Sequence, residues 1–278
     1  MSEALVLGGG GVAGIAWTTG LLTGLAAAGA HVTAADLVVG TSAGATVAAQ
    51  LGSGQSLAQL YARQADPSLQ TEEITAELDL EKIGAEFGAV FEQAADPLGL
   101  RRAIGRYALA AQTVPEARRR AVIAARLPSH EWPSSALKIV AVDAETGEPR
   151  VFDRASGVPL VDAVAASCAV PGVWPPVTIG PHRYVDGGVR SGENADYAEG
   201  FDRVLIVVPM GEAESFPTER PLSEVVDDFR AAGRKVAIIR PDAAAQEAIG
   251  TNVLDPATRT PAAEAGRAQG QGQAIVWE

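Results

Sequence analysis

The stretch LVVGTSAGA, residues 37–45, runs from apolar residues into a turn in which two glycines surround a serine. Residues 36–39 predict a buried strand, and residues 45–51 predict a helix that follows the turn. Just before them, residues 5–7 lead into four glycines, and the apolar residues 15–28 predict another helix. Strand, helix, strand and helix within about fifty residues are typical of a parallel sheet covered on both faces.

The middle of the chain, residues 56–127, differs in character. It is rich in Ala, Glu, Gln and Arg at helical spacing and lacks a convincing strand, which predicts a helical insertion beside the sheet. In its segment PEARRRAVIAARL, residues 115–127, we expect Val122, Ile123 and Leu127 on one helix face and the arginines on the other. A lid over a site and helices that simply pack on the core both fit this pattern.

Strand and helix signals alternate again after residue 136. We predict a strand at 137–142, a hairpin in AETGEPRVF with Thr146-Gly147 as its turn, and a helix at 160–167. A proline-dense loop, a strand ending before Asp186 and a buried strand in RVLIVVPM follow. The last predicted elements are a helix at 222–232, a strand at 236–239 and a mostly helical tail to Gln273. Because these elements interleave, the sequence predicts one domain, residues 1–278, with a three-layer α/β/α fold and a mainly parallel central sheet.

Composition and charge narrow the classes of function. The 278 residues are 47% hydrophobic and 20% charged, as in ordinary soluble globular proteins. A formal net charge of −12 argues against nucleic acid as a partner, because phosphate binding requires clustered Lys and Arg. A local apolar patch still allows transient contact with a membrane surface.

The cysteine usage and the N-terminal residues indicate the compartment. The single cysteine, Cys168, excludes an internal disulfide and fits a reducing environment. The first residues, MSEALVLGGG, carry an acid where an export signal carries positive charge. The apolar residues 14–30 are interrupted by Gly, Thr and His and are short for a membrane span. We therefore expect a cytoplasmic protein with neither a signal peptide nor a transmembrane segment.

A candidate nucleophile lies in the turn quoted first. The five residues from Gly40 to Gly44 fit the pattern Gly-x-Ser-x-Gly, with an apolar strand before it and a helix after it. Such a sharp turn exposes the serine hydroxyl, and the flanking glycines remove Cβ atoms that would clash. The start of the helix also places free N–H groups near Ser42. The alternative is that Ser42 only caps the helix.

A serine nucleophile needs a base, and two kinds are available. The three histidines are His31, His130 and His182, of which only His182 lies near a second candidate motif. That motif, the sequence Asp-Gly-Gly at 186–188, places a carboxylate at the end of a short strand, where burial could make it basic enough to accept a proton. An ordinary Asp-Gly turn is the alternative for this motif, and a Ser-His triad through His182 is the minority hypothesis.

The glycine loop at residues 8–11 offers a third element. A strand, glycines and a helix in this order direct several backbone N–H groups into one concavity, which suits either a phosphate or a developing oxyanion. The spacing of Gly9, Gly11 and Gly14 also matches the dinucleotide fingerprint. That fingerprint requires an acid at the end of the second strand, whereas Asp36 begins the strand, so a nucleotide is disfavoured.

The three motifs in this order give the chain a resemblance to the patatin-like phospholipase family. The stretches that carry it are LVLGGGGVAGIAW (5–17), LVVGTSAGA (37–45), AASCAVPGVWPPV (165–177) and YVDGGV (184–189). No single motif is specific, but the ordered set with these flanks is. The resemblance covers most of the chain, although residues 56–127 match the family only as helices.

The resemblance implies a lipid acyl hydrolase with a Ser-Asp dyad and an acyl-enzyme intermediate. Ser42 would be the nucleophile and Asp186 the general base. The resemblance further assigns an oxyanion hole to the backbone N–H groups of Gly10, Gly11, Val12 and Ala43, with Gly9, Gly14, Gly40, Gly44, Gly187 and Gly188 as motif glycines. It implies a lipid or fatty-acyl ester substrate and neither a metal nor an organic cofactor.

One departure from the family pattern stands out. The family often has Arg or Lys just before the last glycine of its first motif, whereas this chain has Ala13. The departure puts the strength of activity in question, but not the fold. Two alternatives therefore stay open: a nucleotide-binding module built on the glycine loop, and a catalytically weak patatin-like protein that acts through interactions.

Overall fold

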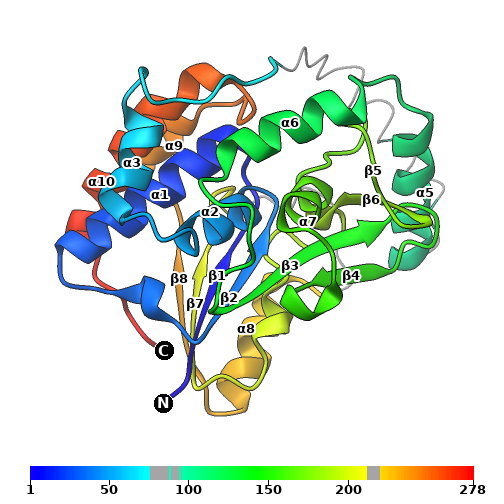
Figure 1. Ribbon diagram of the computed structural model, residues 1–278. Helices are drawn as coiled ribbons and strands as arrows, with labels where there is room; N and C mark the ends of the chain where they lie inside the picture. The colour runs from blue at the N-terminus through cyan, green and yellow to red at the C-terminus, as the bar shows by residue number, and fades with distance from the viewer. Residues whose placement is uncertain (76–87, 89–93, 95, 212–219) are drawn as a thin grey trace.

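A central sheet of eight strands organises the molecule, which Figure 1 shows as a computed structural model describing residues 1–75, 88, 94, 96–211 and 220–278. Its strands follow the order β5-β6-β3-β2-β1-β7-β8, and β4 pairs with β3. The parallel part contains β1 (Glu3–Leu7), β2 (Leu37–Thr41), β3 (Ala136–Asp143), β7 (Arg203–Val207) and β8 (Lys235–Ile239). The antiparallel strands are β4 (Pro149–Phe152), β5 (Val177–Ile179) and β6 (His182–Asp186).

The two faces of the sheet belong to separate apolar cores. In β1, Leu5 and Leu7 join one core, while Ala4 and Val6 join the other, as the period of two along a strand requires. The first core is completed by α1 (Gly11–Ala27), α2 (Ala43–Leu51), α7 (Leu160–Ser167), α9 (Ala243–Ile249) and α10 (Arg259–Gly272). The second is covered by α8 (Leu222–Ala231). The predicted three-layer α/β/α fold with a mainly parallel sheet is confirmed.

Helices α1 and α10 lie in close contact, although they stand at opposite ends of the chain (Figure 1). A Cβ atom at Gly20 would lie 2.1 Å from the Ala263 carbonyl oxygen, and one at Gly266 would lie 2.2 Å from the Trp17 carbonyl oxygen. Only glycine allows the backbones to approach so closely. The predicted helical tail is therefore a structural partner of the helix that follows the glycine loop.

Most helices and strands of the structure begin and end close to the residues that we predicted, and a few differ. The hairpin β3–β4 and helix α7 are confirmed. The first helix starts at Gly11 rather than at residue 15, because the glycine loop turns directly into the helix. Strand β2 extends to Thr41, and α2 begins immediately after Ser42. A strand that we did not predict, β5, begins where the proline-dense loop ends and pairs with β6.

The predicted insertion at 56–127 contributes α3 (Leu57–Ala65), α5 (Pro97–Ala110) and α6 (Glu116–Arg126). No strand occurs among its described residues, and residues 76–87, 89–93 and 95 of this prediction lie outside the described part of the chain. Ser56 and Gln59 form a capping box that starts α3, and the Asp96 side chain caps α5.

The amphipathic assignment of α6 needs a correction. We expected its arginines on the face opposite Ile123, but Arg119 and Arg126 are buried on the same face as Ile123. The spacing of 119, 123 and 126 follows the helical repeat, so the three side chains lie one above another. The arginines tolerate burial because ion pairs and an aromatic ring meet them, and these contacts come from residues distant in the sequence.

Candidate active site

Ser42 lies in a sharp turn between β2 and α2. Its φ of 54° and ψ of −115° are strained for a residue with a side chain. A Cβ atom at Gly44 would lie 1.9 Å from the Leu7 carbonyl oxygen, so a residue other than glycine would push the turn away from β1. Ser42 makes no side-chain capping hydrogen bond to α2, in contrast to a serine whose role is to cap. The geometry is that of a nucleophile elbow.

Two residues at the end of α7 hold the backbone of the elbow. The Ser42 N–H donates to the Ser167 hydroxyl at 2.9 Å, and Ser167 in turn donates to the Val140 carbonyl at 2.6 Å. The Cys168 thiol donates to the Ser42 carbonyl at 3.2 Å. These contacts satisfy both backbone groups of a buried, strained residue.

Asp186 ends β6 beside the elbow and is 5% exposed. Burial raises the pKa of its carboxyl to about 6, against the lowering effects of the Gly188 N–H, the Ser42 hydroxyl and the charge of Arg119. Its Oδ1 accepts the Gly188 N–H at 2.8 Å, whereas its buried Oδ2 has no hydrogen-bond partner among the described residues. One carboxylate oxygen is thus available to accept a proton.

Ser42 and Asp186 line one cavity of about 170 Å³, together with Gly9, Gly10 and Gly11. The other lining residues are mostly apolar and include Val170, Pro171, Val189, Met210, Val253 and Leu254. The sequence-predicted nucleophile, base and glycine loop therefore meet at a single apolar cavity.

The glycine loop presents unpaired donors to this region. Gly9 N–H donates to the Gly192 carbonyl and Ala13 N–H to the Val253 carbonyl. Within the described residues, no backbone hydrogen bond uses the N–H of Gly10, Gly11 or Val12, and the same holds for Ala43. Gly11 and Ala43 are the first residues of α1 and α2, where N–H groups lack helical partners. Two helix N-termini thus face the elbow with free donors.

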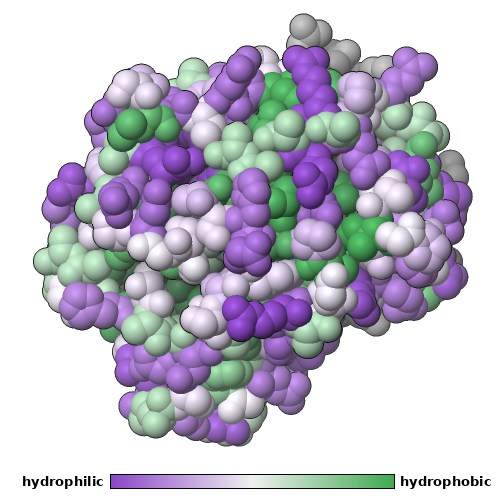
Figure 2. All heavy atoms as spheres, in the orientation of Figure 1, coloured by the Kyte–Doolittle hydropathy of each residue, from purple (hydrophilic) through white to green (hydrophobic). Residues whose placement is uncertain are grey.

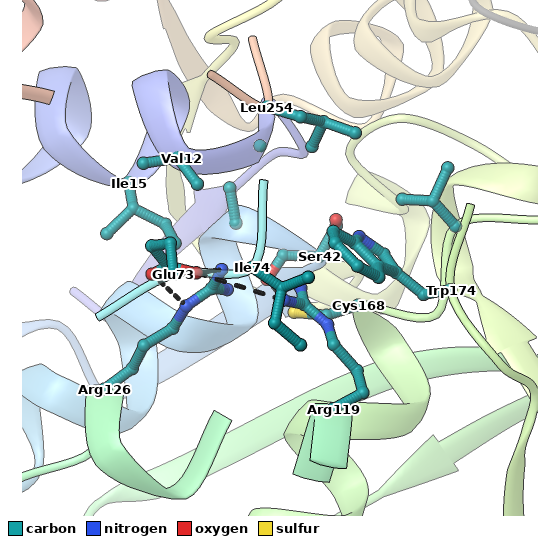
Figure 3. A pocket seen from close by; sticks show the side chains of 13 residues that line it. Val12, Ile15, Ser42, Glu73, Ile74, Arg119, Arg126, Cys168, Trp174 and Leu254 are labelled. Atoms are coloured by element: carbon teal, nitrogen blue, oxygen red, sulfur yellow. Dashed lines mark hydrogen bonds and ion pairs between the residues drawn. The ribbon is translucent and has the colours of Figure 1, made fainter. Parts of the chain in front are cut away.

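A second, smaller cavity of about 20 Å³ lies on another side of Ser42. Its walls include Gly11, Val12, Ser42 and Ala43, and also Glu73, Ile74, Arg119, Arg126, Cys168 and Trp174. A space of this size holds about one water molecule or one oxygen atom. Figure 3 shows Arg119 reaching from α6 toward Ser42 and Trp174, and Arg126 paired with Glu73.

Comparison with known protein families shows to which family a chain with this site belongs. Residues 5–199 match the patatin-like phospholipase family, and they make up well over half of the 278 residues. The chain belongs to this family. The resemblance first seen in three motifs thus extends over both the strand-helix repeat and the insertion.

The patatin-like chain is also similar to solved structures. One is VipD from Legionella pneumophila, at 13% identity and a TM-score of 0.47, covering 98% of this chain and 66% of VipD. Another is ExoU from the type III secretion system of Pseudomonas aeruginosa, solved in complex with SpcU. The two chains are 18% identical with a TM-score of 0.39, and the match covers 100% of this chain and 54% of ExoU. This chain spans about half to two thirds of those chains. No curated protein matches.

The histidines of this patatin-like protein lie away from the elbow. All three are described, and none lines either cavity at Ser42. His182 Nδ1 is 2.8 Å from Asp143 Oδ2, and His130 Nε2 is 3.0 Å from the Ala124 carbonyl oxygen. His31 lies beside a different cavity, near Trp277. The geometry therefore disfavours a Ser-His triad.

The nucleotide-binding alternative also loses support. Asp36 precedes β2 and accepts the Glu3 N–H at 2.8 Å, while the other end of β2 carries the elbow. The place where the fingerprint requires a ribose-binding acid is thus taken by Ser42. Among the described residues, no three His, Cys, Asp or Glu side chains group as a metal site. The helices in the described part of the chain also lack the apolar length that a membrane span requires.

The sequence did not point to the charged wall of the small cavity. Glu73, Arg119 and Arg126 come from the insertion, and Trp174 comes from the proline-dense loop. The spacing of Arg119, Ile123 and Arg126 could have indicated that these arginines share the buried face of α6. Ala13, where the family often has a cation, is fully buried in the main apolar core.

Proposed function

We propose that this protein hydrolyses acyl esters of lipids through an acyl-enzyme intermediate on Ser42. The observation that carries the proposal is the shared cavity: a serine in a strained elbow, a buried carboxylate with one free oxygen, and unpaired N–H donors line it together. A nucleophile, a base and an electrostatic partner for the carbonyl oxygen are the parts that acyl transfer needs.

In the first step, the Ser42 oxygen attacks the ester carbonyl carbon while Asp186 takes the hydroxyl proton. The π electron pair of the carbonyl moves to its oxygen, which becomes a tetrahedral oxyanion. We assign the binding of that oxygen to the N–H groups of Gly10, Gly11, Val12 and Ala43, which have no backbone hydrogen-bond acceptor among the described residues. When the carbonyl re-forms, the bond to the leaving alkoxide breaks, and the alkoxide takes the proton from Asp186.

In the second step, water attacks the acyl-Ser42 carbonyl and gives its proton to Asp186. The tetrahedral intermediate collapses, Ser42 leaves as the alkoxide and recovers the proton, and a free carboxylic acid is released. Asp186 suits both steps, because its raised pKa of about 6 makes it a stronger base than an exposed aspartate while leaving it ionised at neutral pH.

The lining of the larger cavity favours an aliphatic acyl chain. Val170, Val189, Val253 and Leu254 surround Ser42 with apolar surface, and Met210 is 37% exposed. An acyl chain gains free energy by leaving water for such a surface. The substrate we propose is therefore a lipid or another fatty-acyl ester, reached through transient contact with a lipid surface.

The decisive experiment is labelling with a fluorophosphonate, which reacts with activated serines. We expect the wild-type protein and an exposed-serine control, Ser135→Ala, to be labelled, and Ser42→Ala to remain unlabelled. In parallel, p-nitrophenyl esters of graded chain length and phospholipid vesicles measure turnover. Labelling that persists in Ser42→Ala would contradict the proposal. A wild-type protein that neither reacts with the probe nor cleaves any ester would instead support the interaction-protein alternative.

A further inference from the structure

Among the described residues, the buried charge cluster that includes the wall of the small cavity holds more arginines than carboxylates. Three buried arginines, Arg119, Arg126 and Arg259, stand around one buried carboxylate, Glu73. A single glutamate balances only one of the three guanidinium groups. Buried charges are normally paired, so the remaining charge needs a partner or a function.

Two of the three arginines are well satisfied. Arg126 donates to both oxygens of Glu73, at 2.8 Å and 2.7 Å. Arg259 donates to the Gln64 side chain at 3.0 Å and to the Thr71 carbonyl at 2.9 Å. Neither guanidinium is left without a partner.

Arg119 differs from both. It is 5% exposed, its Nη1 is 3.9 Å from a Glu73 oxygen, and its Nε and Nη1 have no hydrogen-bond partner among the described residues. Its guanidinium carbon lies 3.8 Å from the centre of the Trp174 ring, which holds the group in place without accepting a conventional hydrogen bond. Arg119 is thus a fixed, desolvated cation, and its Nε and Nη1 donors have no acceptor among the described residues.

The position of these donors suggests their use. Arg119 lines the same cavity as Ser42 and the N-terminal residues Gly11, Val12 and Ala43, and that cavity has room for about one oxygen atom. Resting on the function proposed above, we propose that Arg119 is a further catalytic residue, whose guanidinium binds the oxyanion formed when Ser42 attacks the ester.

The movement of charge during the first step explains why this contact would accelerate the reaction. As Asp186 takes the Ser42 proton it loses its negative charge, and an equal charge appears on the former carbonyl oxygen. Of the two cavities described at Ser42, Asp186 lines the larger and Arg119 lines the smaller. The negative charge therefore moves toward Arg119 in the transition state, and an interaction that strengthens there raises kcat.

The charge state of Arg119 is compatible with this role. Burial and the neighbouring charge of Arg126 lower the pKa of Arg119 to about 9, and the nearby Cys168, Glu73 and Asp186 counteract them in part. The guanidinium therefore stays protonated at neutral pH. Its poor hydration makes it receptive to an anion that completes its coordination.

The test compares Arg119→Met with Arg118→Met, the same change at the exposed neighbouring position of α6. We measure kcat and KM on a neutral p-nitrophenyl ester, the affinity for a trifluoromethyl ketone whose serine adduct carries an oxyanion, and the affinity for an ether analogue that cannot react. We expect Arg119→Met to lower kcat and ketone affinity by about 100-fold, with KM and ether affinity nearly unchanged. Arg118→Met should match the wild type.

The outcomes separate this inference from the proposed function. Wild-type kcat and ketone affinity in Arg119→Met, with Ser42→Ala inactive, would overturn the role of Arg119 and leave the serine mechanism intact. An equal loss of ether and ketone affinity would also overturn it, because the residue would then only shape the cavity. If Arg119→Met does not fold, Arg119→Gln is judged by the same criteria. Persistent labelling of Ser42→Ala contradicts the serine mechanism itself.

Discussion

The Ser167 hydroxyl accepts the Ser42 N–H at 2.9 Å and is buried completely. The same hydroxyl donates to the Val140 carbonyl of β3 at 2.6 Å. One side chain therefore connects the elbow to a neighbouring strand and to α7. This connection opposes the strain that the positive φ of Ser42 introduces, because rotation of the elbow would break a buried hydrogen bond.

Removing this hydroxyl should loosen the elbow. In Ser167→Ala the Ser42 N–H is buried without its partner, so we expect the free energy of unfolding to fall by about 1–3 kcal/mol. Catalysis should fall as well, since the Ser42 hydroxyl is less firmly placed. Urea unfolding and the rate of fluorophosphonate labelling measure the two effects. Ser135→Ala, at an exposed position, is the control, and unchanged stability in Ser167→Ala would contradict the role of the hydrogen bond.

The buried carboxyl of Asp186 sets the expected pH dependence. Burial raises its pKa to about 6, and only the ionised form accepts the Ser42 proton. We therefore expect kcat/KM to be level above pH 7 and to fall below pH 6 by about tenfold per pH unit. A pH profile on a neutral ester, with circular dichroism to confirm folding at each pH, measures this limb. Activity that stays level down to pH 4.5 would exclude Asp186 as the base.

We expect the buried carboxylate of Asp186 to lower the free energy of unfolding at neutral pH. Its pKa is higher in the folded state than in the unfolded chain, so the folded state binds more protons between pH 4 and 6. The contribution of Asp186 to the free energy of unfolding is therefore most favourable at low pH, and it is lost as the pH rises through 6. A shift from 3.8 to about 6 corresponds to about 3 kcal/mol at pH 7.5.

Asp186→Asn keeps an oxygen for the Gly188 N–H and removes the charge. We expect this variant to unfold at higher urea concentration than the wild type at pH 7.5, and the difference to disappear near pH 4. It should also be inactive. Asp227→Asn, which changes an exposed carboxylate, should show neither effect. A variant that is less stable than the wild type at pH 7.5 would argue against a costly buried charge.

The sequence allowed the sharp turn at Ser42 and the place of Asp186 at the end of a strand to be predicted, because each belongs to a short, local pattern. A strand, a turn with glycines and a helix determine the elbow at Ser42, and a strand followed by Asp-Gly-Gly determines the position of Asp186. The sheet could be predicted for the same reason, since buried parallel strands are continuous apolar runs. Strand β5 was missed because it has only three residues and directly follows Pro175 and Pro176, which are typical of loops.

The small cavity could not be predicted, because its parts come from distant segments. Glu73 and Arg126 pair across 53 positions, and Trp174 lies 55 positions after Arg119, which its ring contacts. An arginine on an amphipathic helix is normally solvated, and only the tertiary partners make burial acceptable. The expectation that arginines face water therefore assigned Arg119 and Arg126 to the wrong face, although their spacing with Ile123 follows the helical repeat.

Cys168 provides a probe of the elbow. Burial raises the pKa of its thiol, and its Sγ donates to the Ser42 carbonyl, so the reactive thiolate is scarce and shielded. We expect iodoacetamide to modify the native protein far more slowly than the urea-unfolded protein. Because Cys168 is the only cysteine of the chain, mass spectrometry measures this rate without ambiguity. Loss of fluorophosphonate labelling should follow the same time course, since an adduct at Cys168 cannot fit beneath the elbow. Fast modification of the native protein with labelling retained would show that this thiol does not support Ser42.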